Sequence, residues 1–159
     1  MKKGFTLVEL LVVVALLGVL AAVGIVSYNN YTYKTKLNSV KFQRSLIIKS
    51  INAELIKCSM GETLVMGDKL YCNWMNLSDW NNLFMNAVVE YSNYVLNMKN
   101  PFNPNQAFTE WSASIPNNDV YLGKVIFHNR NETETCIKTP CNDANNRIIE
   151  TVNFEDLIN

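Results

Sequence analysis

The chain has 159 residues, 48% of them hydrophobic, and its 14 basic and 14 acidic side chains leave no net charge. This length allows one small domain beside any membrane segment. There are only three arginines, and no basic cluster follows the first few residues. The composition therefore gives little support for nucleic-acid binding.

The first feature along the chain is an apolar run from Phe5 to Val26, which contains a single carboxylate, Glu9. The run is long enough to cross a bilayer as a helix. An unpaired carboxylate inside such a helix costs about 2.5–3.5 kcal/mol on insertion scales. We therefore expect Glu9 to have a partner inside the membrane or inside an assembly.

The basic residues on either side of this run predict its orientation. Lys2 and Lys3 lie directly before it, and the next basic residue after it is Lys34. Because flanking positive charge favours the cytoplasmic side, we expect a cytoplasmic amino terminus and an exported remainder. Without the first two lysines, the 14 basic side chains become 12 against 14 acidic ones, a net charge of −2.

Residues 2–10, which read Lys-Lys-Gly-Phe-Thr-Leu-Val-Glu-Leu, resemble the leader and mature start of type IV pilins and pseudopilins. In that family a prepilin peptidase cuts after the glycine and methylates the new terminus, and the glutamate neutralises this amine, usually on a neighbouring subunit. The resemblance implies cleavage between Gly4 and Phe5, a methylated Phe5 amine, and an assembly role for Glu9.

The same resemblance implies how the chain is divided. A leader would comprise residues 1–4, a transmembrane and assembly helix residues 5–27, and an exported pilin head residues 28–159. Before assembly the chain would cross the inner membrane once, in contact with lipid and the pilus assembly machinery. Afterwards it would be extracellular, in a helical filament of identical subunits. The resemblance implies a structural protein, not an enzyme.

Two simpler interpretations of the apolar run remain open. A cleaved secretory signal would also have Lys2, Lys3, an apolar core and small residues such as Ala21 and Ala22. Its core is normally 7–15 uncharged residues, whereas this run has 22 and carries Glu9. A plain single-pass anchor fits the length but does not account for the carboxylate.

Beyond the apolar run, a helical stripe predicts that the helix continues to residue 58. Its apolar members recur at three- and four-residue steps, with Arg44 as the one polar interruption: Tyr33, Leu37, Val40, Ile47, Ile51 and Leu55. No proline interrupts residues 5–58, and Gly61 is the expected stop. The resulting helix of about 75 Å would be apolar all round in its first half and amphipathic in its second.

The rest of the chain predicts a small α+β head. A second helix is expected from Ser78, its N-cap, to the Asn100-Pro101 pair, with one packed face: Trp80, Phe84, Ala87, Val88, Tyr91 and Val95. Strands are expected at Val120–His128, Glu132–Thr139 and Arg147–Phe154. We expect an antiparallel sheet of three to four strands packed on the long helix. The resulting order, a helix, a loop and then an antiparallel meander, is also the order of elements in pilins.

The four cysteines predict two disulfides, because they form two local pairs in a chain expected to be exported. The favoured pairing joins Cys58 to Cys72 and Cys136 to Cys141, one of three possible connectivities. A zinc site is the alternative, but only the second pair has a suitable spacing and no histidine lies near either pair.

No catalytic or cofactor-binding pattern is recognisable in the sequence. The only histidine, His128, falls in an expected strand, and we interpret it as a structural residue. The Asp143 turn could offer oxygens to Ca²⁺, but one carboxylate is a poor ligand set, so no metal is expected.

One position departs from the family pattern. Many pilins have a proline where Val26 stands here, and the family's helix can lose its hydrogen bonds in this region on assembly. Gly18 and Gly24 are present, and each lowers helix stability by about 1 kcal/mol relative to alanine. Local melting therefore stays possible without the proline.

We expect the chain to be a structural subunit of a type IV pilus. A pseudopilin of a secretion system or a minor pilin is the alternative within the superfamily. A signal-anchored periplasmic binding domain that never polymerises is the alternative from another class.

Overall fold

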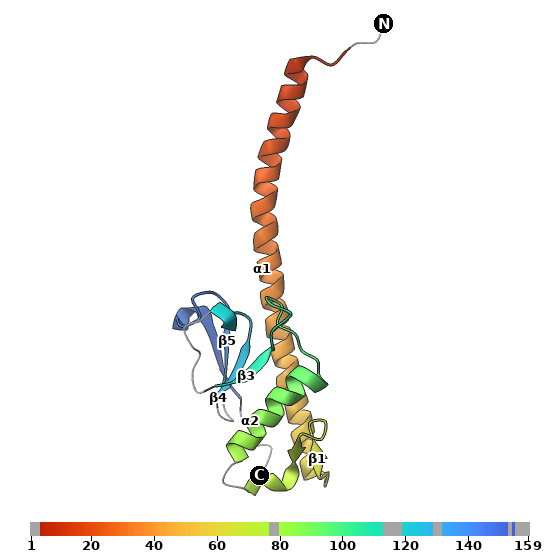
Figure 1. The fold of residues 1–159 in the computed structure, drawn as a ribbon, viewed down its shortest axis with the longest axis vertical. Coiled ribbons are helices and arrows are strands. Elements are labelled where there is room, and N and C mark those ends of the chain that lie inside the picture. The colour runs from red at the N-terminus through yellow and green to blue at the C-terminus, as the bar shows by residue number, and fades with distance from the viewer. Residues whose placement is uncertain (1–3, 77–79, 113–118, 129–131, 153, 155–159) are drawn as a thin grey trace. The chain divides into compact units, whose positions relative to one another are not determined.

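A computed structural model describes the chain except for residues 1–3, 77–79, 113–118, 129–131, 153 and 155–159 (Figure 1). The described chain forms two compact units, Met1–Lys36 and Leu37–Asn159. The long helix α1, Leu7–Ser59, contributes to both. The second unit contains the remaining helices and strands and is the α+β, pilin-like part expected from the sequence.

The carboxyl end of α1 is closed by Gly61, as predicted. The Gly61 N–H donates to the Cys58 carbonyl and the Glu62 N–H donates to the Lys57 carbonyl, both at 3.1 Å. These two bonds form a Schellman motif, in which the residue after the helix has a positive φ. Gly61 has a φ of +96° and has no Cβ to oppose it.

The amphipathic half of α1 buries the predicted stripe from Val40 onward, whereas Leu37 is half-buried and Tyr33 is exposed. The buried side chains of α1 are Val40, Arg44, Ile47, Ile51 and Leu55. They join a core that includes Phe84 of α2, Phe108 and Phe127. The periodicity was sufficient to predict this face because burying one stripe of a helix requires apolar residues at three- and four-residue steps.

The main sheet has the strand order β3-β4-β5-β6, with bounds Thr109–Trp111, Val125–His128, Glu132–Cys136 and Arg147–Thr151. The predicted three-strand antiparallel meander corresponds to β4, β5 and β6. The fourth strand, β3, pairs in parallel with β4, so the sheet is mixed.

The three meander strands are shorter than the sequence predicted. Residues Asp119–Tyr121 form a 3-10 turn, and Gly123 has a φ of +76°, so β4 begins only at Val125. The strand expected to reach Thr139 ends at Cys136, and the last strand ends at Thr151. The expected link at residues 129–131 lies outside the described residues.

The second helix, α2, spans Trp80–Glu90 and continues through a wider π-type turn, Tyr91–Val95. It ends before Asn97, which has a φ of +50°, and therefore earlier than the predicted Asn100-Pro101 stop. The predicted N-cap, Ser78, and the side chain of Trp80 lie outside the described part of the chain. Val95 was expected on the packed face but is 47% exposed.

The side chain of Asn93 positions strand β3, which the sequence analysis did not predict. Its amide nitrogen donates to the Thr109 carbonyl at 2.9 Å, and its oxygen accepts from the N–H groups of Phe108 and Thr109 at 3.0 Å. One side chain of the π-type turn thus pairs with a short strand as a backbone would. This pairing holds β3 beside the helix that precedes it.

A two-stranded hairpin, β1 (Leu64–Val65) and β2 (Leu70–Tyr71), follows α1 and was also not predicted. Its four-residue connection contains Met66, Gly67 and Asp68, all with positive φ. The Met66 N–H donates to the Glu54 carboxylate at 2.7 Å. The hairpin is therefore fixed to the last turns of α1.

Candidate functional site

The amino terminus of α1 is closed by a reciprocal pair of side chains, Thr6 and Glu9. The backbone N–H and the hydroxyl of Thr6 donate to the Glu9 carboxylate at 2.8 and 2.7 Å, and the Glu9 N–H donates to the Thr6 hydroxyl at 3.3 Å. This is a capping box, in which an N-cap threonine and a glutamate three residues later satisfy free N–H groups at the helix end.

The capping box changes the expectation for Glu9. The sequence analysis treated its carboxylate as unpaired within the single chain, whereas the structure gives it two hydrogen bonds from Thr6. These bonds solvate the charge without neutralising it. Thr-x-x-Glu before an apolar run is a readable signature of a helix start, and the sequence analysis did not use it.

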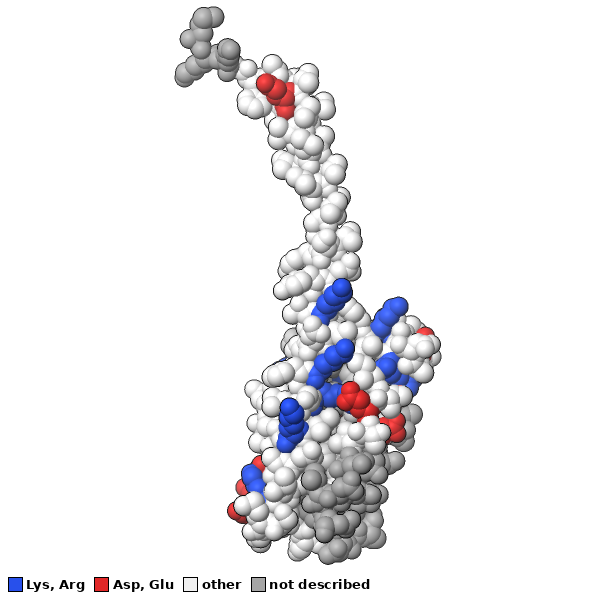
Figure 2. Space-filling model, turned by 180° about the vertical axis from the view of Figure 1, so that it is seen from behind, with Lys and Arg blue, Asp and Glu red and all other residues white. Residues whose placement is uncertain are grey.

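The first turns of α1 present an apolar surface on every side. The large hydrophobic side chains of residues 5–26 are between 44% and 80% exposed. Figure 2 shows one acidic side chain near the start of this otherwise uncharged stretch. By its length and composition alone, α1 is able to cross a membrane. So large an exposed apolar surface needs lipid or protein to cover it.

The two glycines of this stretch leave α1 uninterrupted. Gly18 and Gly24 both lie inside the helix, and a Cβ at either position would meet no atom within 4 Å. Neither glycine is therefore required by packing within the chain. Whether the helix melts near them in a filament stays a prediction.

Arg44 connects the amphipathic half of α1 to the sheet. Its guanidinium is 2.6 Å from the Glu150 carboxylate on β6, and its Nε donates to the Thr133 hydroxyl on β5 at 3.1 Å. The Arg44 side chain is only 5% exposed. The polar interruption of the predicted stripe is thus the residue that joins the helix to two strands.

Two disulfides are present in the head. Cys58, in the last turn of α1, is joined to Cys72 directly after β2, with 5.5 Å between their Cα atoms. Cys136, at the end of β5, is joined to Cys141, with 5.4 Å between their Cα atoms. The first fixes the hairpin to α1, and the second closes the connection between β5 and β6.

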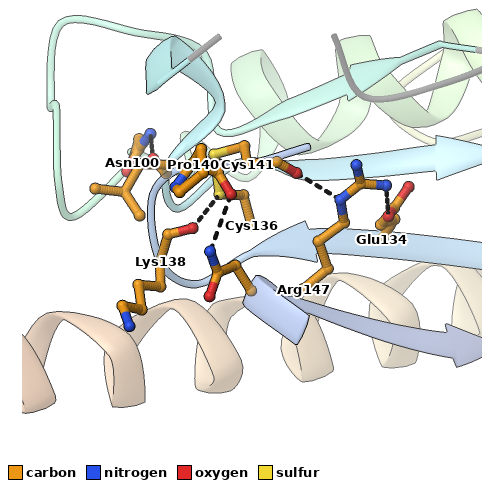
Figure 3. The surroundings of a disulfide bond; sticks show 9 residues. Asn100, Glu134, Cys136, Lys138, Pro140, Cys141 and Arg147 are labelled. Carbon is orange, nitrogen blue, oxygen red and sulfur yellow. Dashed lines mark hydrogen bonds and ion pairs between the residues drawn. A yellow bond between two sulfur atoms is a disulfide. The ribbon is translucent and has the colours of Figure 1, made fainter. Parts of the chain in front are cut away.

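Beside the second disulfide lies a network of charged side chains that was not predicted (Figure 3). Arg147 donates to the Cys141 carbonyl and lies 2.6 Å from Glu134. The other oxygen of Glu134 is 2.8 Å from His128 Nε2, and the Glu134 side chain is 8% exposed. His128 is therefore a structural residue of the sheet. No group of metal-ligating side chains occurs among the described residues.

Comparison with known proteins points to the amino-terminal segment. Residues 1–25 match the family described as the prokaryotic N-terminal methylation motif. The chain is 34% identical over 67 residues to a type IV major fimbrial protein FimA of Dichelobacter nodosus, covering 42% of this chain and 43% of that protein.

A fimbrial protein of Pseudomonas aeruginosa is 53% identical over 36 residues, which are 23% of each chain. The chain thus matches less than half the length of these curated relatives. No solved structure matches it significantly. The match to the methylation motif covers the first part of α1, where the capping box and the exposed apolar surface lie.

Proposed function

We propose that the chain is a structural subunit of a type IV pilus that polymerises through the apolar part of α1. The observation that carries this proposal is the coincidence of three features in one segment. These are the N-terminal methylation motif, an apolar surface exposed on all sides, and a lone carboxylate at the third helical position. A filament core of such helices would cover that surface by close packing.

Glu9 would then have two successive partners. In the single chain Thr6 donates two hydrogen bonds to its carboxylate. In a dry filament core a buried charge left without a counter-charge is strongly destabilising, by about 3–5 kcal/mol. A methylated Phe5 amine of a neighbouring subunit would supply the missing positive charge, and this pairing would set the axial register between subunits.

Cleavage and membrane insertion precede assembly in this proposal. A prepilin peptidase would remove residues 1–4 and methylate Phe5, leaving residues 5–27 as a single-pass inner-membrane helix with a cytoplasmic amino terminus. The intact mass of the exported protein tests this step. A mass corresponding to a start at Phe5 plus one methyl group is expected, whereas a start after Ala22 would exclude the pilin assignment.

The assembly role of Glu9 can be separated from its capping role. Glu9→Gln removes the charge but retains the ability to complete a capping box, because glutamine serves as well as glutamate there. Glu9→Val removes both. If the charge pairs with a neighbouring amine, both variants are processed and inserted but form few or no filaments in electron micrographs.

Each other outcome has a distinct meaning. Filaments formed by Glu9→Gln but not by Glu9→Val would assign Glu9 to helix capping alone. Normal filaments from both variants would show that Glu9 has no assembly role, whereas absence of the unchanged chain from filaments would favour the anchored domain that never polymerises. A pseudopilin or minor pilin would give the same mass but would be a trace component of purified filaments, so quantifying the chain in them distinguishes these alternatives.

A further inference from the structure

Strand β6 is an edge strand with free backbone groups. It pairs with β5, and no described strand pairs with its other side. The hydrogen bond from the Ile137 N–H to the Asn146 carbonyl, at 2.8 Å, shows which of the opposing residue pairs of β5 and β6 are hydrogen-bonded. Because bonded and non-bonded pairs alternate, Ile149 and Thr151 direct their backbone N–H and C=O groups away from β5.

A groove of about 710 Å³ lies between β6 and the amphipathic half of α1. The helix lines it with residues of one face, including Lys41, Ser45, Ile48 and Lys49. Strand β6 lines it with Ile148, Glu150 and Thr151, and Val152, directly after the strand, lines it as well. One wall is a face of α1, and the other is the part of β6 beside its unpaired edge, where Thr151 lines the groove and Ile149 lies between two other lining residues. A helix face next to a strand edge suits an extended peptide.

The groove has a net positive charge. Lys41 and Lys49 are both exposed, and Arg44 is paired with Glu150, the one carboxylate among the described lining residues, so that carboxylate does not offset the two lysines. Figure 2 shows basic side chains at intervals along α1 beside a smaller acidic group. An acidic ligand therefore complements the groove.

We propose that this groove binds an extended acidic segment of another protein, which adds to β6 as a fifth strand of the sheet. Backbone hydrogen bonds to Ile149 and Thr151 would supply register, and ion pairs to Lys41 and Lys49 would supply preference for acidic sequences. This proposal concerns only the head and is independent of filament assembly.

The spacing of the lysines predicts the ligand pattern. Lys41 and Lys49 are eight residues apart, which is about 12 Å along a helix. Four residues of an extended strand span about 13 Å, and residues four apart point to the same side. For a ligand strand that runs along α1, carboxylates at positions i and i+4 therefore match the two lysines, whereas i and i+3 place them on opposite sides.

The first test uses synthetic peptides and the full chain in detergent. The probe is a nine-residue peptide of alternating threonine and valine with glutamates at i and i+4, measured by fluorescence anisotropy. Shifting one glutamate to i+3, or methylating the backbone nitrogens that would face β6, is expected to weaken binding at least tenfold. Equal binding of the methylated peptide would exclude strand addition, and absence of binding by the parent peptide both to the full chain and to a chain ending at Phe154 would exclude the site.

The second test uses the protein side. Lys41→Glu and Lys49→Glu should each weaken binding about fivefold or more, while Lys138→Glu, an exposed lysine that does not line the groove, should leave it unchanged. Equal losses in all three variants would mean non-specific attraction. Near-UV circular dichroism of each variant checks that the fold is kept.

Three further measurements test the strand pairing and identify the occupant. Bound peptide should slow hydrogen exchange of the Ile149 and Thr151 amides at least tenfold, and unchanged exchange would contradict the proposal. If a chain ending at Phe154 binds the peptide and the full chain does not, residues 155–159 would be the natural occupant of the groove. If the chain self-associates and the double variant Lys41→Glu/Lys49→Glu does not, the occupant of the groove would be a second copy of this chain. Either result would overturn the proposal.

Discussion

The guanidinium of Arg44 is 2.6 Å from the carboxylate of Glu150, and the two side chains differ widely in exposure, 5% against 57%. The burial penalty therefore falls on the arginine, which relies on its strand partners for compensation. This asymmetry predicts that the two halves of the pair are not equivalent when one is removed.

Glu150→Ala should destabilise the head more than Arg44→Met. The first leaves the buried Arg44 guanidinium with only the Thr133 hydroxyl as a partner. The loss in free energy of unfolding should approach the roughly 3–5 kcal/mol of a fully buried broken pair but stay below it, because Glu150 is half exposed. The second removes the charge and keeps most of the packed stem. Urea unfolding of the full chain in detergent measures both, and the reverse order would contradict this account.

Loss of the Cys58–Cys72 disulfide should cost more than loss of Cys136–Cys141. The cysteines are 14 and 5 residues apart, so the chain-entropy model gives about 3 and about 2 kcal/mol. Paired serine substitutions compared by urea unfolding test the order. Peptide mapping without reduction tests the pairing, and recovery of a Cys58–Cys136 peptide would contradict it.

Gly123→Ala should destabilise the head by about 2–4 kcal/mol. Gly123 has a positive φ, and a Cβ there would lie 2.6 Å from both Asn100 Oδ1 and Phe102 Cδ2. Gly61→Ala is the matched control, because its φ is also positive but no atom lies within 4 Å of its Cβ. It should cost only about 1 kcal/mol. Equal losses in the two variants would show that backbone strain alone matters at Gly123.

Alkaline pH should weaken the head through Tyr91. Burial and the nearby Glu54 carboxylate raise the pKa of Tyr91, although Lys57 opposes them. The unfolded chain then releases this proton at lower pH than the folded one, so stability is complete below about pH 10 and falls as the pH rises beyond it. Tyr91→Phe should flatten this decline in stability. Tyr94→Phe should not, because the Tyr94 side chain is 79% exposed. Denaturation midpoints between pH 8 and 11 provide the measurement.

Local pattern was sufficient to predict the elements whose signals are local. The stripe on α1, its Gly61 stop and the three meander strands each depend on residues close together in sequence. The missed elements depend on distant partners or on very short segments. Strand β3 has three residues and pairs with a strand 16 positions later, so it has no alternation long enough to recognise.

The same distinction applies to the sites. The Thr6–Glu9 capping box was readable from the sequence, but the assembly interpretation of Glu9 drew attention away from it. The His128–Glu134–Arg147 network was not readable, because it brings together residues from three strands whose register only the folded sheet defines.

The Cys58–Cys72 bond also determines how the chain would respond to mechanical load. A pull that reaches the carboxyl end of α1 would next load the hairpin segment, because that segment directly follows the helix. The cross-link spans 14 positions, whose ends without it could be drawn to a separation of roughly 45–50 Å. With the bond intact, force passes from Cys58 to Cys72 through sulfur, and that length is unavailable for elongation.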